Sequence, residues 1–501
     1  MLRSLLAVAL FVLLVSVSPV LAQDTPYTPD WASLTQHETP DWFLDAKFGL
    51  YFHWGPYSVP AFRSEWYSHW MYIPGENWGT DFRTHHENTF GPLSEFGYKD
   101  FIPMFTAEHF DAADWAALFR RAGARFAGPV AEHADGFAMW DSDLTRWDAM
   151  DMGPRRDVVG ELEQAVRDEG LKFITTLHHH WNWGWYATWD ETTDAANPAY
   201  AEFYGPKLPE TAFPGGLQDP DPFPDSAFVQ LWLGKTNEVV DKYRPDLLWF
   251  DNRAFIIPDE TRREMLAHYY NQAAERGQSV SMIYKHEDFA EGSGVVDLER
   301  GRMDQLMPYP WMTDDSIDWQ TWSHMNEPPP NYKGADRLID GLIDIVSKNG
   351  TLLLNVTPRA DGTIPDGVRE RLYAMGDWLA ANGEAIYGTR PWTIFGEGPT
   401  DVAPGHFQEA QIGAFTGQDI RFTQKGGHLY AIVMAWPGER AVIPSLGLNR
   451  DLLEGTIDRI TLLDTRQPLA FTRSAEALTV KMPEDGDQNA LAYVLKITFA
   501  R

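Results

Sequence analysis

The sequence predicts a (β/α)8-like barrel followed by a C-terminal antiparallel β-sandwich. Short apolar runs alternate with longer amphipathic stretches between about residues 45 and 385, several of these runs end in polar clusters, and shorter alternating strands take over after Gly388. Polar side chains at the ends of successive parallel strands are typical of one face of such a barrel. We therefore expect a signal segment at 1–22, a barrel domain at 23–388 and a sandwich domain at 389–501.

Residues 1–22 carry the pattern of a secretory signal peptide. One arginine near the start is followed by a continuous apolar stretch and then by small residues before the polar Gln23. A membrane anchor is the alternative, but the apolar core is short for a transmembrane helix. We expect a secreted or periplasmic protein without stable membrane insertion after the signal is cleaved.

The barrel region contains six clear strand candidates and five helix candidates. Strands are expected at 48–52, 126–130, 173–177, 247–250, 280–284 and 351–356. Helices are expected at 112–122, 156–169, 228–243, 259–276 and 335–348, where apolar residues recur at helical spacing. Gly350 is interpreted as the left-handed cap of the last helix. A doubly wound open sheet is the alternative fold, but no glycine-rich phosphate turn follows the first strand.

The C-terminal region reads as a series of short strands separated by Gly, Pro and Asp turns. Strands are expected at 419–423, 429–435, 456–463, 478–482 and 492–499. This pattern predicts an antiparallel β-sandwich. The region holds few aromatic or ionisable clusters, so we expect a structural role, with carbohydrate binding as the alternative.

The composition excludes several classes of function. Forty-one Lys and Arg against seventy-two Asp and Glu leave a formal charge of -31, which opposes binding to nucleic acid. The absence of cysteine excludes disulfides, thiolate metal sites and a cysteine nucleophile. Aromatic residues make up 14% of the chain, and they offer flat faces for a sugar ring, although core packing is the alternative for any one of them.

Asp251 is the best candidate for a catalytic carboxylate. It directly follows a loop and an apolar strand, which would place it at the mouth of the barrel. A helix N-cap is the alternative role for an aspartate after a strand. Glycoside hydrolysis generally needs two carboxyl groups on either side of the bond that is cleaved.

His178, His179 and His180 form a run at a strand end that also suggests a metal site. Adjacent residues on an extended strand point to opposite faces, so at most two of the three converge, and no nearby ligand set completes the site. We therefore expect no metal there. Neutral imidazoles both donate and accept hydrogen bonds, which suits sugar hydroxyls.

Four long strings, at 46–72, 133–161, 244–251 and 348–366, together resemble glycoside hydrolase family 29, the α-L-fucosidases. They occur in the family's order across nearly the whole catalytic region. The resemblance implies a barrel with a C-terminal β-sandwich, an exo mode of action, retention of configuration at the anomeric carbon, and no metal or other cofactor. It also implies a fucosylated glycan or polysaccharide as the substrate.

The resemblance also implies roles for individual residues. Asp251 matches the family nucleophile, and Trp249 matches an aromatic wall beside it. The remaining residues are expected to contact the sugar, with Trp322 near its methyl group: His53, Glu65, Trp66, His133, His178, His179 and Trp322.

Two departures from the family pattern affect the expected chemistry. Ala134 stands where the family has a second histidine, and Met312 follows Trp311 where many members have the acid/base glutamate. Glu299 is the nearest replacement, although a cation at Arg300 would hold it ionised if the two side chains met. The alternatives for the acid/base are Glu287, Asp314, Asp315 and Glu327.

The function predicted is that of an exo-acting retaining α-L-fucosidase, with Asp251 as nucleophile and Glu299 as acid/base. A non-catalytic sugar-binding relative is one alternative, and an enzyme for a different glycone, such as an α-L-galactoside, is another. The linkage, the aglycone and the oligomeric state are left open by the sequence.

Overall fold

The computed structural model describes residues 26–212, 219–453, 455–484 and 491–500. The predicted signal segment, residues 1–22, lies outside the described residues. Within the described part of the chain, no helix has the length and apolar character required to cross a membrane.

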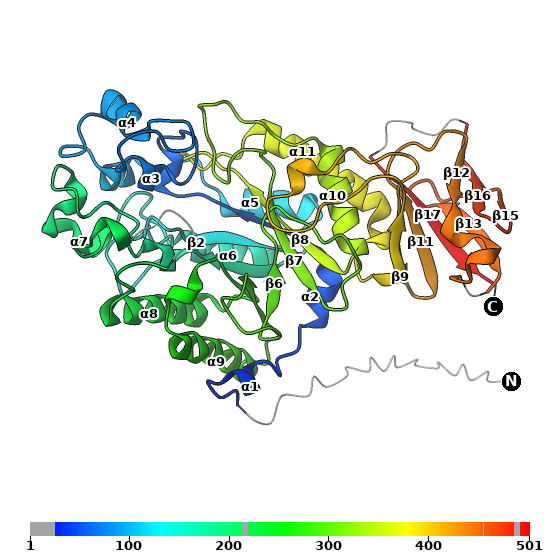
Figure 1. The fold of residues 1–501 in the computed structure, drawn as a ribbon, viewed down its shortest axis with the longest axis horizontal. Coiled ribbons are helices and arrows are strands. Elements are labelled where there is room, and N and C mark those ends of the chain that lie inside the picture. The colour runs from blue at the N-terminus through cyan, green and yellow to red at the C-terminus, as the bar shows by residue number, and fades with distance from the viewer. Residues whose placement is uncertain (1–25, 213–218, 454, 485–490, 501) are drawn as a thin grey trace, which may run out of the picture.

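Eight parallel strands form a closed barrel in chain order, so the predicted fold class is confirmed (Figure 1). The first strand pairs with the second on one side and with the eighth on the other, which closes the sheet. The strands are β1 (Phe48–Phe52), β2 (Phe126–Glu132), β3 (Lys172–Leu177), β4 (Leu247–Phe250), β5 (Ser281–Lys285), β6 (Val295–Asp297), β7 (Trp311–Ser316) and β8 (Gly350–Val356).

Strands β6 and β7 were not predicted. The first has only three residues, and the second carries Thr313, Asp314 and Asp315 in its middle, so neither has the apolar run that marked the other six. Met312 points into the barrel interior and is fully buried there. The methionine that follows Trp311 therefore serves the core of the barrel.

Side chains alternate across the barrel wall. Tyr51 and Trp249 belong to the core inside the barrel, whereas Leu50 and Leu248 belong to the core between the strands and the surrounding helices. This period of two is what a strand imposes. The same alternation points every second side chain near the C-terminal end of a strand toward the barrel axis.

Helices surround the barrel (Figure 1). The five predicted ones are α5 (Ala112–Arg121), α6 (Val158–Asp168), α8 (Ser226–Tyr243), α9 (Asp259–Glu275) and α10 (Ala335–Ser347), and α11 (Asp366–Asn382) was not predicted. Shorter helices are α1 (Trp31–Leu34), α2 (Asp41–Ala46), α3 (Tyr67–Trp70), α4 (Phe82–Phe90) and α7 (Ala201–Tyr204). Asp111, Asp157 and Asp225 begin α5, α6 and α8 by accepting hydrogen bonds from first-turn N–H groups.

The turn between α10 and β8 differs from the prediction. The left-handed residue is Asn349, with φ of 74°, whereas Gly350 already begins β8. A Cβ at Gly350 would lie 2.6 Å from the Ile345 side chain and 2.7 Å from the Trp311 ring. Close packing, and not backbone conformation, requires glycine there.

The C-terminal region forms a six-stranded antiparallel sheet in the order β14-β13-β17-β11-β10-β9 and a three-stranded sheet in the order β12-β16-β15. Leu429 and Val433 face a core shared by the two sheets, while Tyr430 and Ile432 join the core between the barrel strands and the surrounding helices. The larger sheet therefore packs on the barrel with one face and on the smaller sheet with the other. The strands are β9 (Arg390–Glu397), β10 (Ile420–Lys425), β11 (His428–Val433), β12 (Arg440–Ile443), β13 (Ile457–Leu462), β14 (Gln467–Leu469), β15 (Phe471–Arg473), β16 (Leu478–Lys481) and β17 (Tyr493–Phe499).

Candidate active site

A cavity of about 790 Å³ opens at the carboxyl ends of the barrel strands. Its volume lies toward the upper end of small-molecule sites, roughly 300–1,000 Å³. Seven consecutive strands each contribute a side chain from their last residues or from just beyond them, in the order His53, His133, His178, Asp251, Lys285, Glu299 and Asp314. Except for His179, the side chains that the sequence predicted all line this cavity: His53, Glu65, Trp66, His133, His178, Trp249, Asp251, Glu299 and Trp322.

The structure places His179 elsewhere, which corrects the expectation that it contacts the ligand. Its ring stacks on Trp232 of α8 with 5.6 Å between the ring centroids, and its Nε2 lies 3.2 Å from both the Trp232 carbonyl and the Thr236 hydroxyl. His178 and His179 leave the strand in different directions, so only His178 reaches the cavity.

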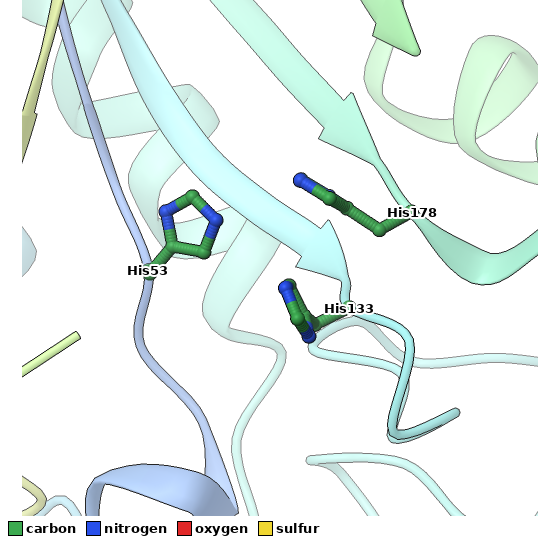
Figure 2. Close-up of side chains that lie close together, drawn as sticks. All are labelled: His53, His133 and His178. Carbon is green, nitrogen blue, oxygen red and sulfur yellow. The ribbon is translucent and has the colours of Figure 1, made fainter. Parts of the chain in front are cut away.

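Figure 2 shows His53, His133 and His178 turned toward one another from β1, β2 and β3. Each offers a ring nitrogen, and these nitrogens lie within 4.8 Å of one another. The side-chain Oδ1 of Asn355 accepts from the backbone N–H of His53 at 3.0 Å and lies 2.9 Å from its Nδ1. Nδ1 of His53 therefore carries the proton, and its Nε2 is left as an acceptor.

Burial keeps these imidazoles neutral. It lowers the pKa of His53, and it lowers the pKa of His133 and of His178 well below the ordinary value. The Nδ1 atoms of His133 and His178 are buried without a hydrogen-bond partner among the described residues. Such a group suits either the hydroxyls of a ligand or a divalent transition metal, because both need neutral ring nitrogens.

Lys285 joins three carboxylates on the opposite side of the cavity. Its Nζ donates to Asp251 Oδ1 at 3.1 Å, Glu299 Oε2 at 2.8 Å and Asp314 Oδ2 at 3.2 Å, and its side chain is 1% exposed. The ammonium also lies 4.8 Å from the ring centre of Trp249. One buried cation thus holds three strand-end carboxylates in a single group.

The two carboxyls with predicted catalytic roles have opposite pKa shifts. Burial acts to raise the pKa of Asp251, but the Lys285 ammonium and His180 outweigh it and leave that pKa below its ordinary value. Burial raises the pKa of Glu299 to about 7, because the charges of Asp314 and Asp251 add to it and offset the effect of Lys285. Near neutral pH, the cavity therefore pairs an ionised carboxylate with a carboxyl that can carry a proton.

Asp297 forms two hydrogen bonds that hold residues around Lys285 in place. Its Oδ2 accepts from Trp249 Nε1 at 3.0 Å, and its Oδ1 accepts from the backbone N–H of Asp314 at 2.8 Å. The pKa of Asp297 is raised well above its ordinary value by burial and by Asp314. The contacts fix the aromatic wall and the end of β7 relative to each other.

Arg300 does not pair with Glu299. Its guanidinium pairs with Glu409 at 2.9 Å, donates to three backbone carbonyls and lies 4.4 Å from the ring centre of Trp322. The cation that does contact Glu299 is Lys285, which the sequence analysis did not single out. The sequence does contain one signal for this contact. Lys285 stands at the end of a strand, and the alternation of side chains along the strand points it into the barrel.

Of the alternative acid/base residues, only Asp314 joins the cavity lining. Asp315 pairs with Lys333, while Glu287 and Glu327 are exposed. Ala134 is buried and does not line the cavity, and its carbonyl accepts from the Asn182 side chain at 3.3 Å.

The wall opposite Lys285 combines polar and aromatic groups. Glu65 lies 3.3 Å from the Thr321 hydroxyl and accepts from the Trp322 backbone N–H at 3.3 Å. The Trp322 ring centre lies 5.6 Å from that of His53. A ligand here meets hydrogen-bonding groups together with aromatic faces, a combination that suits a small molecule with both polar and apolar parts.

Comparison with known proteins gives consistent matches over nearly the whole chain. A model of the α-L-fucosidase family matches residues 14–384, and a model of the α-L-fucosidase C-terminal domain matches residues 414–498. The tissue α-L-fucosidase of Rattus norvegicus is 32% identical over 466 residues, which are 91% of this chain and 89% of the relative. The plasma α-L-fucosidase of Homo sapiens is 31% identical over 474 residues, which are 92% and 89% of the two chains.

A solved structure is similar over the same extent. The crystal structure of the Thermotoga maritima α-fucosidase in complex with fucose aligns with a TM-score of 0.71 and 28% sequence identity. The alignment covers 94% of this chain and 100% of that one. The likeness therefore includes both the barrel and the sheets that follow it.

Proposed function

The chain belongs to the α-L-fucosidase family of glycoside hydrolases, and we propose that it is an exo-acting retaining α-L-fucosidase that removes terminal α-L-fucosyl residues from glycans. Asp251 is the nucleophile and Glu299 is the acid/base. The observation that carries the mechanism is the pair of contacts from Lys285 to these two carboxylates.

The separation of the carboxylates supports retention. Because their oxygens lie 3.1 and 2.8 Å from the same nitrogen, they are within about 6 Å of each other. Retaining pairs are roughly 5–5.5 Å apart, whereas inverting pairs are roughly 6.5–9.5 Å apart to leave room for a water molecule. Direct attack by Asp251 is therefore favoured over activation of a water from that side.

The reaction then proceeds in two displacements. Asp251 attacks the anomeric carbon while Glu299 gives its proton to the glycosidic oxygen, so the C–O bond breaks and a fucosyl-aspartate ester forms. Glu299, now ionised, takes a proton from water, and the hydroxide equivalent displaces Asp251 and regenerates both groups. A pKa of about 7 suits Glu299 to both steps.

The sugar pocket is proposed to bind fucose through its hydroxyls and its methyl group. His53, His133, His178 and Glu65 present neutral nitrogens and carboxylate oxygens for the hydroxyls. Trp322 offers an aromatic face for the methyl that replaces a hydroxymethyl group in L-fucose. No metal or other cofactor takes part in this proposal, because the two carboxyls supply the nucleophile and the proton.

The test is hydrolysis of an aryl α-L-fucoside followed by NMR, with the Asp251→Ala variant beside the wild type. We expect α-L-fucose as the first product and a loss of activity of roughly a thousandfold or more in the variant. Release of β-L-fucose first would contradict retention. An inactive wild-type protein that still binds fucose would identify a sugar-binding relative instead.

Substrate range and export are tested separately. Aryl α-L-fucoside and α-L-galactoside rates, measured side by side, distinguish the proposed glycone from the alternative with a hydroxyl at C6. Export is supported by the sequence of residues 1–22. N-terminal sequencing of secreted protein should begin close to Gln23.

A further inference from the structure

The cavity extends beyond the groups assigned to fucose. Trp78 and Phe407 also line it, yet neither belongs to the carboxylate group nor to the histidine cluster. They are the most exposed aromatic side chains among the described residues, at 63% and 58%. Large exposed aromatic rings beside a binding cavity are candidates for ligand contact.

Both residues have a backbone conformation that costs energy for a bulky side chain. The φ angle is 51° at Trp78 and 57° at Phe407, in the left-handed region that favours glycine. Strained backbone of this kind is retained where the surrounding structure fixes it, often at binding sites. The two rings are thus held in exposed positions against the preference of their backbone conformation.

Neighbouring aromatic rings brace Trp78. Its ring centre lies 5.5 Å from that of Trp66 and 5.1 Å from that of Trp70, in tilted and edge-on arrangements. Trp66 itself lines the cavity. The aromatic surface is therefore continuous from the fucose pocket to the mouth.

Phe407 is fixed by the loop that carries the proposed acid/base. Its N–H donates to the Glu299 carbonyl at 2.8 Å, and the Glu299 N–H donates to His406 Nδ1 at 3.0 Å. Glu409 adds the ion pair to Arg300 at 2.9 Å. The connection between β9 and β10 thereby brings the backbone of Phe407 into contact with the backbone of Glu299, the residue proposed to protonate the departing oxygen.

We propose that Trp78 and Phe407 form an aglycone subsite, which binds the neutral sugar on the leaving-group side of the scissile bond by packing against its C–H faces. This inference rests on the proposed fucosidase function and specifies its substrate class as oligosaccharides or glycans with a pyranose next to fucose. The remaining groups near the mouth include Arg63, Gln320, His286 and His406, which offer hydrogen bonds to hydroxyls.

A saccharide fits this surface better than an extended apolar ligand does. The lining combines aromatic rings with polar side chains, and its carboxylates other than Glu65 form the group around Lys285. The subsite and the fucose pocket belong to one cavity. The sugar that departs after Glu299 protonates its oxygen is therefore the part of the substrate that reaches Phe407. An acyl chain would leave the polar side chains unpaired.

The experiment compares two substrates that share the fucosyl group. In α-L-fucosyl fluoride the leaving group is a single atom, whereas in a neutral α-L-fucosyl disaccharide it is a second pyranose. Phe407→Ala and Trp78→Ala are measured on both substrates. Phe223→Ala is the matched control, because Phe223 is 50% exposed and does not line the cavity.

We expect each cavity variant to lower kcat/KM for the disaccharide about tenfold more than for the fluoride. Phe407→Trp should retain the wild-type ratio, and Phe223→Ala should leave it unchanged. Equal losses on both substrates, or no loss on the disaccharide, would overturn the subsite. A wild-type protein that fails to hydrolyse the fluoride would instead contradict the fucosidase function itself.

Discussion

Two buried charge clusters in this protein have opposite compositions. The acid-rich cluster in the cavity places Lys285 among Asp251, Glu299 and Asp314. The cation-rich cluster, between α10 and the C-terminal sheet, surrounds Asp344. Its carboxylate lies 2.8 Å from Lys348, 2.7 Å from Arg421 and 4.0 Å from Arg302.

The difference in composition produces opposite pKa shifts for the same residue types. Burial acts against the charge of Lys285, but its carboxylates raise its pKa well above the ordinary value, while burial lowers the pKa of Lys348 to about 8. Glu299 has a pKa raised by burial to about 7. Burial opposes the charge of Asp344 too, yet its cations hold that pKa at about 2.

An excess of carboxylates thus gives one cluster a carboxyl that exchanges a proton near neutral pH, whereas an excess of cations keeps the shared carboxylate of the other cluster ionised. The first composition suits acid/base chemistry. The second suits a fixed link between the barrel and the sheet. We expect substitutions in the first cluster to change the reaction, and substitutions in the second to change stability.

The largest expected effect comes from Glu299→Gln. The amide cannot donate its proton to a departing oxygen, so kcat/KM for a fucosyl disaccharide should fall by roughly 10²–10⁴-fold. The loss should be much smaller for α-L-fucosyl fluoride, whose leaving group needs no protonation. The exposed neighbour Glu287 provides the control, since Glu287→Gln should leave both rates unchanged. An equal loss of kcat/KM on both substrates would contradict the assignment of Glu299 as the general acid.

Asp344→Ala should lower the free energy of unfolding by about 3–5 kcal/mol, because it leaves buried cations without their shared counterion. Chemical denaturation followed by fluorescence measures the change. Asp377, which pairs with Arg121 on the surface with side chains 69% and 47% exposed, offers a matched control. Asp377→Ala should cost less than about 1 kcal/mol. Similar costs for the two variants would contradict a structural role for the cation-rich cluster.

The pH dependence of kcat/KM follows from the two carboxyls that are proposed to be catalytic. Activity on a disaccharide should fall as pH rises through about 7, where Glu299 loses the proton it must donate. It should also fall at acid pH, below the ordinary aspartate pKa, where Asp251 becomes protonated. With α-L-fucosyl fluoride only the acid limb should remain. A basic limb that persists for the fluoride would point to another titrating group.

The smallest expected effect is that of metal removal. His53, His133 and His178 are assigned to the hydroxyls of the sugar, so dialysis against a chelator should leave kcat unchanged. Addition of Zn²⁺ should inhibit competitively if it binds the three rings at all. Loss of activity on chelation, with recovery on adding Zn²⁺, would make the three histidines a metal site.

Much of this molecule could be predicted from local sequence patterns. Apolar runs in the sequence identified six of the eight barrel strands. The polar residues that follow these runs include His53, His133, His178 and Asp251, which all line the cavity. The two strands without an apolar run differ from the rest: β6 has only three residues, and β7 carries Asp314 of the acid-rich cluster in its middle. Apolar patterning is therefore weakest in the strands that carry or precede the ionisable residues of the cavity.

Other features depend on contacts between distant parts of the chain. The sequence left open whether Arg300 contacts Glu299, and in the structure Arg300 pairs with Glu409 while Lys285 from β5 contacts Glu299. Phe407 lies more than a hundred residues beyond Glu299 and reaches it through a loop between sheet strands. No spacing rule along the sequence connects such residues.

Trapping the covalent intermediate tests the central claim most directly. A 2-deoxy-2-fluoro-α-L-fucosyl fluoride slows both displacements, and peptide mapping by mass spectrometry then locates the attached sugar. We predict one fucosyl group per chain, attached to the peptide that contains Asp251 and absent from the Asp251→Ala variant. Attachment to Glu299 or Asp314, or turnover of fucosides with no attached sugar, would contradict the assignment of Asp251 as the nucleophile.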